Sequence, residues 1–293
     1  MHIAYNYMYT MLIYINYTHI ITCILCLCIL YGFCLHNDIY IYIFNIQHVH
    51  ASRCFDVIYF DFKSAFETVT HSKLLELLPK FGVSTKIVAW INDFLRERTF
   101  HVRVHDTLSE KAYATSGCPQ STNPGPLMFI LYINSLKSII PENVQYKIYA
   151  DDVKIYGRIY EANSAEDCKK LQDTVNNLYK WSVSLDLKLS VTKCVVLHFN
   201  HGNAENSYTI GGHYLASKKL IRDLGVMTSI NKKYTEHITN IVLRATQRAN
   251  WITRSFILRD PHIYSKLIEM YVLPIITYAA PVWNPRLKKV SEF

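Results

Sequence analysis

Charged residues are scarce in this chain, and the first fifty residues have almost none. The 293 residues are 18% charged and 50% hydrophobic, a balance that excludes general disorder. Residues 1–50 contain no Lys or Arg and one acid, Asp38. All 31 basic residues therefore lie in 51–293, against 22 acids, a net charge of +9. This excess indicates either a polyanionic partner or a solvated basic surface.

Several motif classes are also missing. The sequence has no glycine-rich phosphate loop of the GxGxxG or Walker type and no GxSxG nucleophile elbow. Cys23-x-x-Cys26 is not followed by a second pair with metal-ligand spacing, which argues against a zinc site. The other cysteines outside the first fifty residues are far apart, which favours reduced thiols in an intracellular protein of the nucleus or cytoplasm. They are Cys54, Cys118, Cys168 and Cys194.

The apolar run over residues 11–35 is long enough to cross a bilayer. It lacks a basic n-region, a basic flank and a cleavage site. Its composition of Ile, Tyr, Asn, His and Cys is typical of translated AT-rich repeats, and the same kind of sequence recurs as IYIYI at 39–43. Two interpretations stay open: non-coding sequence translated through a wrong gene model, or a true membrane anchor. The composition changes near Ala51, where we place a domain boundary.

From residue 51 onward, strand-like and helix-like segments are interleaved without a strict βαβ repeat. This order predicts an α+β fold with an antiparallel sheet. Gly82 is expected to end one helix and Ser84 to cap the next. Helical spacing predicts buried faces made of Leu74, Leu78 and Phe81, then Ile87, Ile91 and Phe94. Strands are expected over 56–62, 99–104, 111–116, 144–157 and 188–199, and helices over 71–82, 84–98, 125–140, 165–185 and most of the chain after 232.

Two adjacent carboxylates, Asp151 and Asp152, stand at the tip of the hairpin predicted for 144–157. Asp61 ends another strand 90 positions before Asp151. Carboxylates brought together from separate strands repel one another unless cations lie between them. Hard oxygen ligands favour Mg²⁺, and two ions about 4 Å apart can activate a 3′-hydroxyl and stabilise a leaving pyrophosphate. The pattern predicts a metal site; a surface turn with two acids is the alternative.

The flanking motifs favour the metal site. DVIYFDFKSAFETVTH, TSGCPQSTNPGPLMFILYINSL, YADD and WSVSLDLKLSVTKC occur in the order and spacing of the reverse transcriptase palm. The set resembles the non-LTR retrotransposon (jockey-like, LINE-type) branch from about Phe55 to Pro285. The resemblance implies a palm over 51–230 and a partial helical thumb over 231–293, with 1–50 outside it. It also implies template-directed transfer of dNTPs to a DNA primer on an RNA template, with two Mg²⁺ or, alternatively, Mn²⁺.

The resemblance assigns the catalytic residues. Asp61 and Asp151 match the two main metal ligands, and Asp152 matches their neighbour. The backbone carbonyl of Phe62 would help to hold the nucleotide's metal. Lys193 matches a lysine that can protonate pyrophosphate as general acid, whereas a solvated surface lysine is the plain alternative.

The nucleotide-binding residues also follow from the resemblance. Phe66 matches an aromatic residue that excludes a 2′-OH and so selects deoxynucleotides, with core packing as the alternative. Gln120 would contact the incoming nucleotide and the primer–template. Ser121 stands where the family has the Gly of PQG, which allows close backbone approach or unusual dihedrals. This departure and the absence of a fingers region before Asp61 suggest an ageing copy. The alternative function is an inactive, element-derived fragment that only binds nucleic acid.

The segment 232–256 has the pattern of an amphipathic thumb helix. A basic stripe on such a helix can follow a phosphate backbone, although a solvated face fits the same pattern. The stripe consists of Lys233, Arg244, Arg248 and Arg254, and the apolar face of Ile238, Ile241, Val242, Ala245, Ala249 and Ile252. The oligomeric state cannot be predicted from the sequence.

Overall fold

The computed structural model describes residues 54–160, 163–200, 203–231, 233–256 and 260–283. They form two compact units. The sheet unit holds the described residues up to Ile221 together with 229–231, and the helical unit holds 222–228, 233–256 and 260–283. The predicted membrane segment 11–35 and the Cys23–Cys26 pair lie outside the described residues. Within the described ranges, no helix is both long and apolar enough to cross a membrane.

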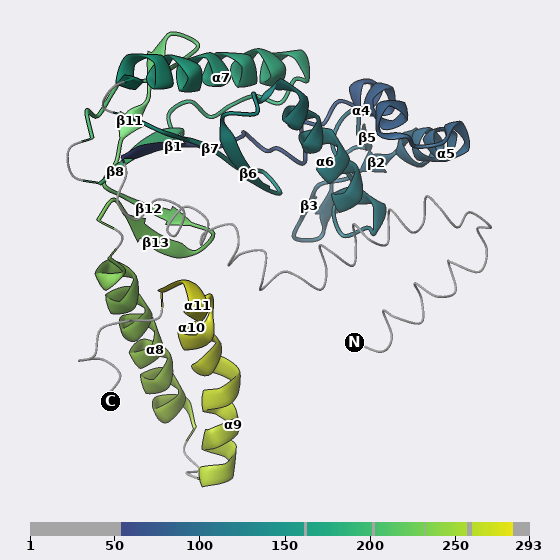
Figure 1. Ribbon diagram of the computed structural model, residues 1–293. Coiled ribbons are helices and arrows are strands. Elements are labelled where there is room, and N and C mark those ends of the chain that lie inside the picture. Colours follow the sequence, from purple (N-terminus) through teal and green to yellow (C-terminus); the bar gives the residue numbers. More distant parts are fainter. Residues whose placement is uncertain (1–53, 161–162, 201–202, 232, 257–259, 284–293) are drawn as a thin grey trace. The chain divides into compact units, whose positions relative to one another are not determined.

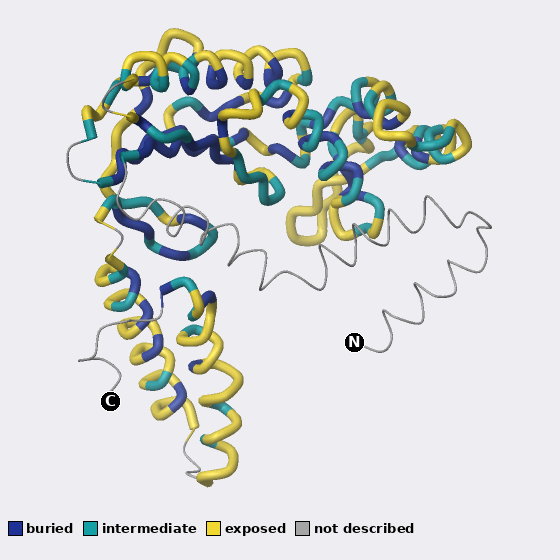
Figure 2. The backbone as a smooth tube through the Cα atoms, in the orientation of Figure 1, coloured by how far each residue is buried: buried dark blue, intermediate teal, exposed yellow. Residues whose placement is uncertain are grey.

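A five-stranded sheet forms the centre of the sheet unit (Figure 1). Its four longer strands pair antiparallel, as predicted, and the short edge strand β11 pairs in parallel with β8. The central strand β1 is buried at every residue (Figure 2), which explains its continuous apolar run. The strand order is β11 (Ala216–Ser217), β8 (Val195–Phe199), β1 (Phe55–Phe60), β7 (Asp152–Arg158) and β6 (Gln145–Tyr149).

The strand predicted over 188–199 is wrong in its first half. Only β8, at Val195–Phe199, is regular strand. Before it the chain turns, because the N–H groups of Lys193 and Cys194 both donate to the carbonyl of Ser190. Leu189 forms an isolated bridge with Phe62, so this turn lies beside the end of β1.

Helices pack against the sheet. The long helix α7 (Ser164–Ser184) runs along one face (Figure 1) and buries Leu171, Val175 and Leu178 at helical spacing. The other helices of this unit are α4 (His71–Leu77), η1 (Leu78–Phe81), α5 (Thr85–Leu95), α6 (Pro124–Asn134) and η2 (Ser135–Ile139). Their positions confirm the predicted helical segments.

Three details of the helix predictions are wrong. Phe81, the last residue of η1, is 41% exposed instead of buried. Ser84 is the N-cap residue of α5, as predicted, but its side chain makes no cap hydrogen bond. Ile87 and Phe94 are half-buried, whereas Leu95 joins Ile91 in the core. Gly82 ends η1 as predicted, with a left-handed φ of 79°.

Three short strand pairs complete the described part of the sheet unit. The hairpin predicted across 99–116 is present as two paired segments, β2 (Thr99–Phe100) with β5 (Ala112–Tyr113) and β3 (Arg103–Val104) with β4 (Thr107–Leu108). A further pair, β9 (Thr209–Ile210) with β10 (His213–Tyr214), was not predicted, because each strand is only two residues long.

An unpredicted hairpin, β12 (Leu220–Asp223) and β13 (Val226–Ser229), contributes residues 222–228 to the helical unit, which continues with the helices predicted after residue 232. These are α8 (Thr235–Ser255), α9 (Pro261–Tyr271), α10 (Leu273–Thr277) and α11 (Ala280–Trp283). Ala245, Ile252 and Val272 form their small core. Val242, predicted on the buried face, is 57% exposed, because it lies 100° around α8 from the buried Ile241.

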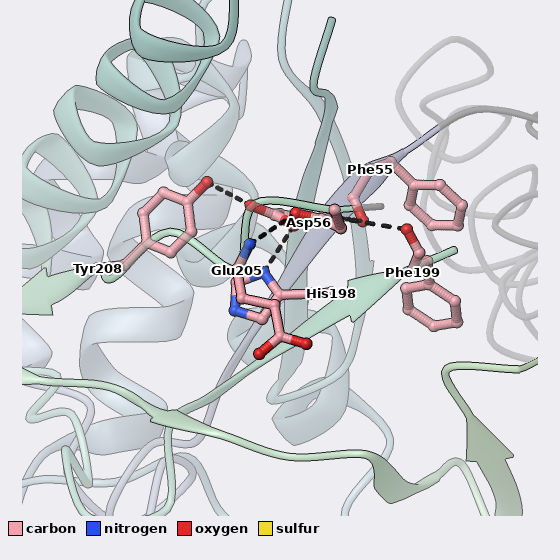
Figure 3. Close-up of polar contacts among 7 residues, drawn as sticks. Phe55, Asp56, His198, Phe199, Glu205 and Tyr208 are labelled. Atoms are coloured by element: carbon pink, nitrogen blue, oxygen red, sulfur yellow. Dashed lines mark hydrogen bonds and ion pairs between the residues drawn. The ribbon is translucent and has the colours of Figure 1, made fainter. Parts of the chain in front are cut away.

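A buried carboxylate ties a loop to the sheet (Figure 3). Asp56 on β1 is fully buried. Its Oδ1 accepts hydrogen bonds from His198 Nδ1 at 2.7 Å and Asn203 Nδ2 at 2.8 Å, and its Oδ2 accepts from the Tyr208 hydroxyl at 2.6 Å. Burial and the negative charge of Asp56 raise the pKa of Tyr208, so its hydroxyl stays protonated and donates. A core carboxylate is stable only with such donors.

Replacing Asp56 with Ala should therefore lower the free energy of unfolding by about 3 kcal/mol, because two buried donors and the half-buried Asn203 lose their acceptor. Urea denaturation followed by circular dichroism measures the loss. Asp93→Asn, an exposed site on α5, is the matched control and should change stability by less than about 0.5 kcal/mol. Equal stability of the two variants would contradict a structural role for the Asp56 network.

Candidate active site

Asp61 lies at one end of the central sheet, directly after β1. The antiparallel register of β1 and β7 ends with Phe60 paired to Val153, and Asp61 and Asp152 are the neighbours of this last pair in the sequence. The backbone carbonyl of Asp61 accepts a hydrogen bond of 2.7 Å from Ser190 N–H. Asp61 is thus held between the β6–β7 hairpin and the turn that precedes β8.

The β6–β7 hairpin closes with a two-residue turn at the same end of the sheet. Tyr149 pairs with Asp152, which leaves Ala150 and Asp151 as the turn residues. Ala150 has a φ of 52°, a left-handed conformation for which hairpin turns usually employ Gly or Asn. Asp151 and Asp152 are both exposed. The fold therefore brings the three predicted carboxylates to one end of the sheet.

One oxygen of Asp61 is suited to a cation. Its Oδ2 is inaccessible to solvent and has no hydrogen-bond partner, although the side chain as a whole is 40% exposed. The positively charged Lys193 Nζ lies 3.6 Å from this oxygen, on a side chain that is 71% exposed. A buried carboxylate oxygen without a donor is a ligand for a hard cation. Within the described ranges, however, no three Asp, Glu, His or Cys side chains are grouped closely enough to hold a metal.

The residues around Asp61 are apolar. Phe62 is buried, and its ring meets Trp181 edge-on with centroids 6.2 Å apart. The Sγ atom of Cys194 lies 3.5 Å from the Asp61 backbone nitrogen. Burial raises the pKa of Cys194 to about 11, so it remains a neutral thiol beside the carboxylate.

Phe66 and the PQ segment lie beside each other. The N–H of Cys118 donates to the carbonyl of Phe66 at 2.8 Å, and Gly117 N–H donates to Val69 at the same distance. The half-buried ring of Phe66 stacks on Phe129 of α6, with centroids 4.0 Å apart. Sequence reasoning left core packing and sugar selection open, and this stacking is compatible with both.

The segment after Cys118 exposes Gln120 and Ser121. Ser121 has a φ of 59°, so a residue with a side chain occupies a left-handed conformation that Gly would adopt without strain. The backbone segments approach each other closely four residues later, at Gly125. A Cβ on Gly125 would lie 1.9 Å from the carbonyl oxygen of Pro119.

The four predicted phosphate-binding residues all belong to the helical unit and are exposed. They are Lys233, Arg244, Arg248 and Arg254. The guanidinium of Arg248 lies over the ring of Trp251, 5.6 Å from its centroid, which leaves its charge at the surface.

Sequence reasoning missed a pocket in the helical unit. Arg222, His237 and Asn240 line it together with Arg244. No motif marks these residues, because the pocket forms only when the β12–β13 hairpin packs on α8.

Residues 38–245 match the reverse transcriptase (RNA-dependent DNA polymerase) family. The chain belongs to this family. The match covers the sheet with Asp61, Asp151 and Asp152 and continues into α8, as the sequence motifs predicted.

Two relatives place this reverse transcriptase chain among mobile elements. It is 24% identical over 190 residues to the RNA-directed DNA polymerase from mobile element jockey of Drosophila melanogaster, covering 62% of this chain and 20% of that protein. It is 25% identical over 239 residues to the probable RNA-directed DNA polymerase from transposon X-element of the same species, covering 78% and 25%. The predicted jockey-like resemblance is confirmed, and the chain spans about a fifth to a quarter of these relatives.

Among solved structures, the reverse transcriptase chain is similar to apo telomerase from Candida tropicalis, truncated from its C-terminal domain. The identity is 14% and the TM-score 0.42, with 67% of this chain and 38% of that chain covered.

Ser121→Gly should raise the free energy of unfolding of this reverse transcriptase chain by about 0.5 kcal/mol. Gly adopts the left-handed conformation without the strain of about 1–2 kcal/mol that Ser has there. The greater conformational freedom of Gly in the unfolded chain offsets part of this gain in stability. Ser72→Gly, at an exposed site inside α4, should instead lose about 0.5 kcal/mol. Urea denaturation measures the free energy of unfolding of both variants. A lower stability in both would mean that the turn tolerates serine.

Proposed function

We propose that this chain carries the nucleotidyl-transfer centre of an RNA-directed DNA polymerase from a jockey-like, non-LTR retrotransposon. It would transfer dNTPs to the 3′-hydroxyl of a DNA primer on an RNA template. One observation carries the proposal: Asp61 follows the end of β1, where Phe60 pairs with Val153 and Asp151 and Asp152 close the β6–β7 hairpin, and Asp61 Oδ2 is buried without a hydrogen-bond donor. Family membership supports the same reaction.

The donor set fits Mg²⁺, which prefers carboxylate and carbonyl oxygens, with Mn²⁺ as the alternative. Asp61 and Asp151 would hold two ions, with Asp152 beside them and the backbone carbonyl of Phe62 as a further oxygen ligand. When bound, such ions supply Lewis-acid activation of the attacking hydroxyl and charge neutralisation at the leaving pyrophosphate.

Lys193 is the proposed general acid. Its ammonium lies 3.6 Å from Asp61 Oδ2, which supports a position beside the proposed metal ligand. In the reaction it would donate a proton to the pyrophosphate oxygen that leaves the α-phosphorus, which makes pyrophosphate a better leaving group. Its 71% exposure leaves the Nζ accessible to a triphosphate.

Phe66, Gln120 and Ser121 would bind the incoming nucleotide. The hydrogen bond from Cys118 N–H to the Phe66 carbonyl keeps these two segments adjacent. The stack on Phe129 would hold the Phe66 ring in one orientation, as a ring that excludes a 2′-OH requires. Gln120 and Ser121 are exposed and available to nucleotide and primer–template.

The nucleic acid would also contact the helical unit. Lys233, Arg244, Arg248 and Arg254 supply exposed positive charge, which binds a phosphate backbone by releasing its counterions. We propose a palm over 51–230 and a partial thumb over 231–293. Residues 222–228 group with the helices that follow them.

Asp151→Asn should abolish primer extension, by more than about 100-fold, because the variant loses a charged metal ligand. The assay incubates the full chain with an RNA template, a DNA primer, dNTPs and Mg²⁺. Asp173→Asn, an exposed site on α7, is the matched control and should extend the primer like the parent.

Binding of the same duplex separates catalysis from recognition. Asp151→Asn should keep its duplex affinity; a loss as large as the loss of extension would refute the catalytic role. If the parent binds the duplex but never extends it, the chain acts as a nucleic-acid-binding fragment instead of a polymerase.

Phe66→Ala should admit ribonucleotides, because the ring that meets the 2′-OH is gone. The measurement is the ratio of rNTP to dNTP incorporation, which does not depend on how much of the variant is folded, and it should rise by at least about 10-fold. Phe129→Leu weakens the same ring stack from the other side without removing Phe66. Because this stack orients the Phe66 ring, Phe129→Leu should raise the ratio less than Phe66→Ala does. No rise in Phe66→Ala would assign Phe66 to core packing.

A further inference from the structure

The pocket of the helical unit combines positive charge with an unused hydrogen-bond donor. It has a volume of about 320 Å³ and lies between the β12–β13 hairpin and the first half of α8. Its polar lining residues are Arg222, His237, Asn240 and Arg244, and Gly225, Met227 and Ile241 complete it.

His237 is the buried residue of this pocket, with 4% of its surface exposed. Its Nδ1 accepts a hydrogen bond of 3.2 Å from the Met227 backbone N–H. Nδ1 therefore carries no proton, and the neutral ring holds its hydrogen on Nε2. This Nε2 is buried and has no partner. Since an unpaired buried donor is costly, it points to an acceptor that binds in the pocket.

The two arginines give the pocket its charge. Among the described residues, neither Arg222 nor Arg244 makes an ion pair with a carboxylate. Burial, followed by the positive charges of these arginines, lowers the pKa of His237, which keeps its ring neutral. Two guanidinium groups held near each other without a counter-ion favour an anion between them.

Packing within the unit holds the hairpin in place. The turn residues Leu224 and Gly225 both have left-handed φ values, 43° and 84°. The Tyr278 hydroxyl donates to the Leu224 carbonyl at 2.8 Å, and Trp283 Nε1 donates to the Tyr278 carbonyl at 2.7 Å. The His237 ring also packs edge-on against Trp283. Arg222 is thus positioned before any ligand binds, which reduces the entropy lost on binding.

We propose that Arg222, Arg244, His237 and Asn240 bind one phosphate group. Four side chains with N–H donors need an anion with more than two oxygens, which favours phosphate over a carboxylate. Guanidinium groups match phosphate oxygens bidentately, and the neutral His237 adds a donor. The identity of the phosphate rests on the proposed function: it belongs to the backbone of the bound nucleic acid. Free inorganic phosphate shares the same chemistry.

The first test titrates inorganic phosphate into the full chain and follows the His237 Nε2–H resonance by NMR. Phosphate should shift this resonance in the parent, and Arg222→Gln should weaken the phosphate affinity by about 10-fold. Lys266→Gln, which removes one charge from the exposed surface of α9, is the control and should bind like the parent. Equal affinity in the parent and in the Arg222→Gln, Arg244→Gln double variant would overturn the site.

The second test identifies the source of the phosphate. Affinity for an RNA–DNA duplex is measured against salt, and Arg222→Gln should lower the slope of log K against log salt by about 1, whereas Lys266→Gln should not. An unchanged slope would overturn the assignment to the nucleic-acid backbone. Both tests measure binding, so a chain that fails to extend a primer could still bind phosphate at this pocket. Conversely, a chain that fails either binding test could still extend a primer, so the two proposals can fail independently.

Discussion

The burial of β1 between β7 and β8 is the constraint on which the sheet unit depends. A strand covered on both faces cannot shift its register by one residue without turning every side chain to the other face. The observed register carries Asp61 to the β6–β7 turn and Asp56 to His198 on β8. The same pairing therefore sets the proposed catalytic end of the sheet and the buried polar network.

Two unfavourable features lie at the proposed catalytic end. Ala150 has a left-handed φ value, and one oxygen of Asp61 is buried without a hydrogen-bond donor. Each costs free energy of about 1–3 kcal/mol that regular packing elsewhere must offset. The Asp56 network shows the contrast, because there every oxygen of a buried carboxylate has a donor.

The helical unit has a different physical basis. The hydrophobic cluster among its helices is small, with the three buried residues Ala245, Ile252 and Val272, and many of its large apolar side chains are exposed, including Trp251 and Met270. Its arginines lie at the surface or line the pocket beside His237. Basic groups at the surface of a unit with a small core repel one another. A bound polyanion would screen this repulsion, so the arrangement suits a surface that binds a polyanion.

The sequence by itself determined the local elements and the family. Periodicity predicted the helices, the apolar run predicted β1, Gly82 marked a helix end, and the motif order identified a reverse transcriptase. Local preferences decide these features. Only the tertiary structure decided that Lys193 reaches Asp61, that Phe66 stacks on Phe129, and that Arg222 meets His237 in one pocket. Such contacts join residues 15 to 132 positions apart, and they depend on which faces pack together, which spacing along the chain does not encode.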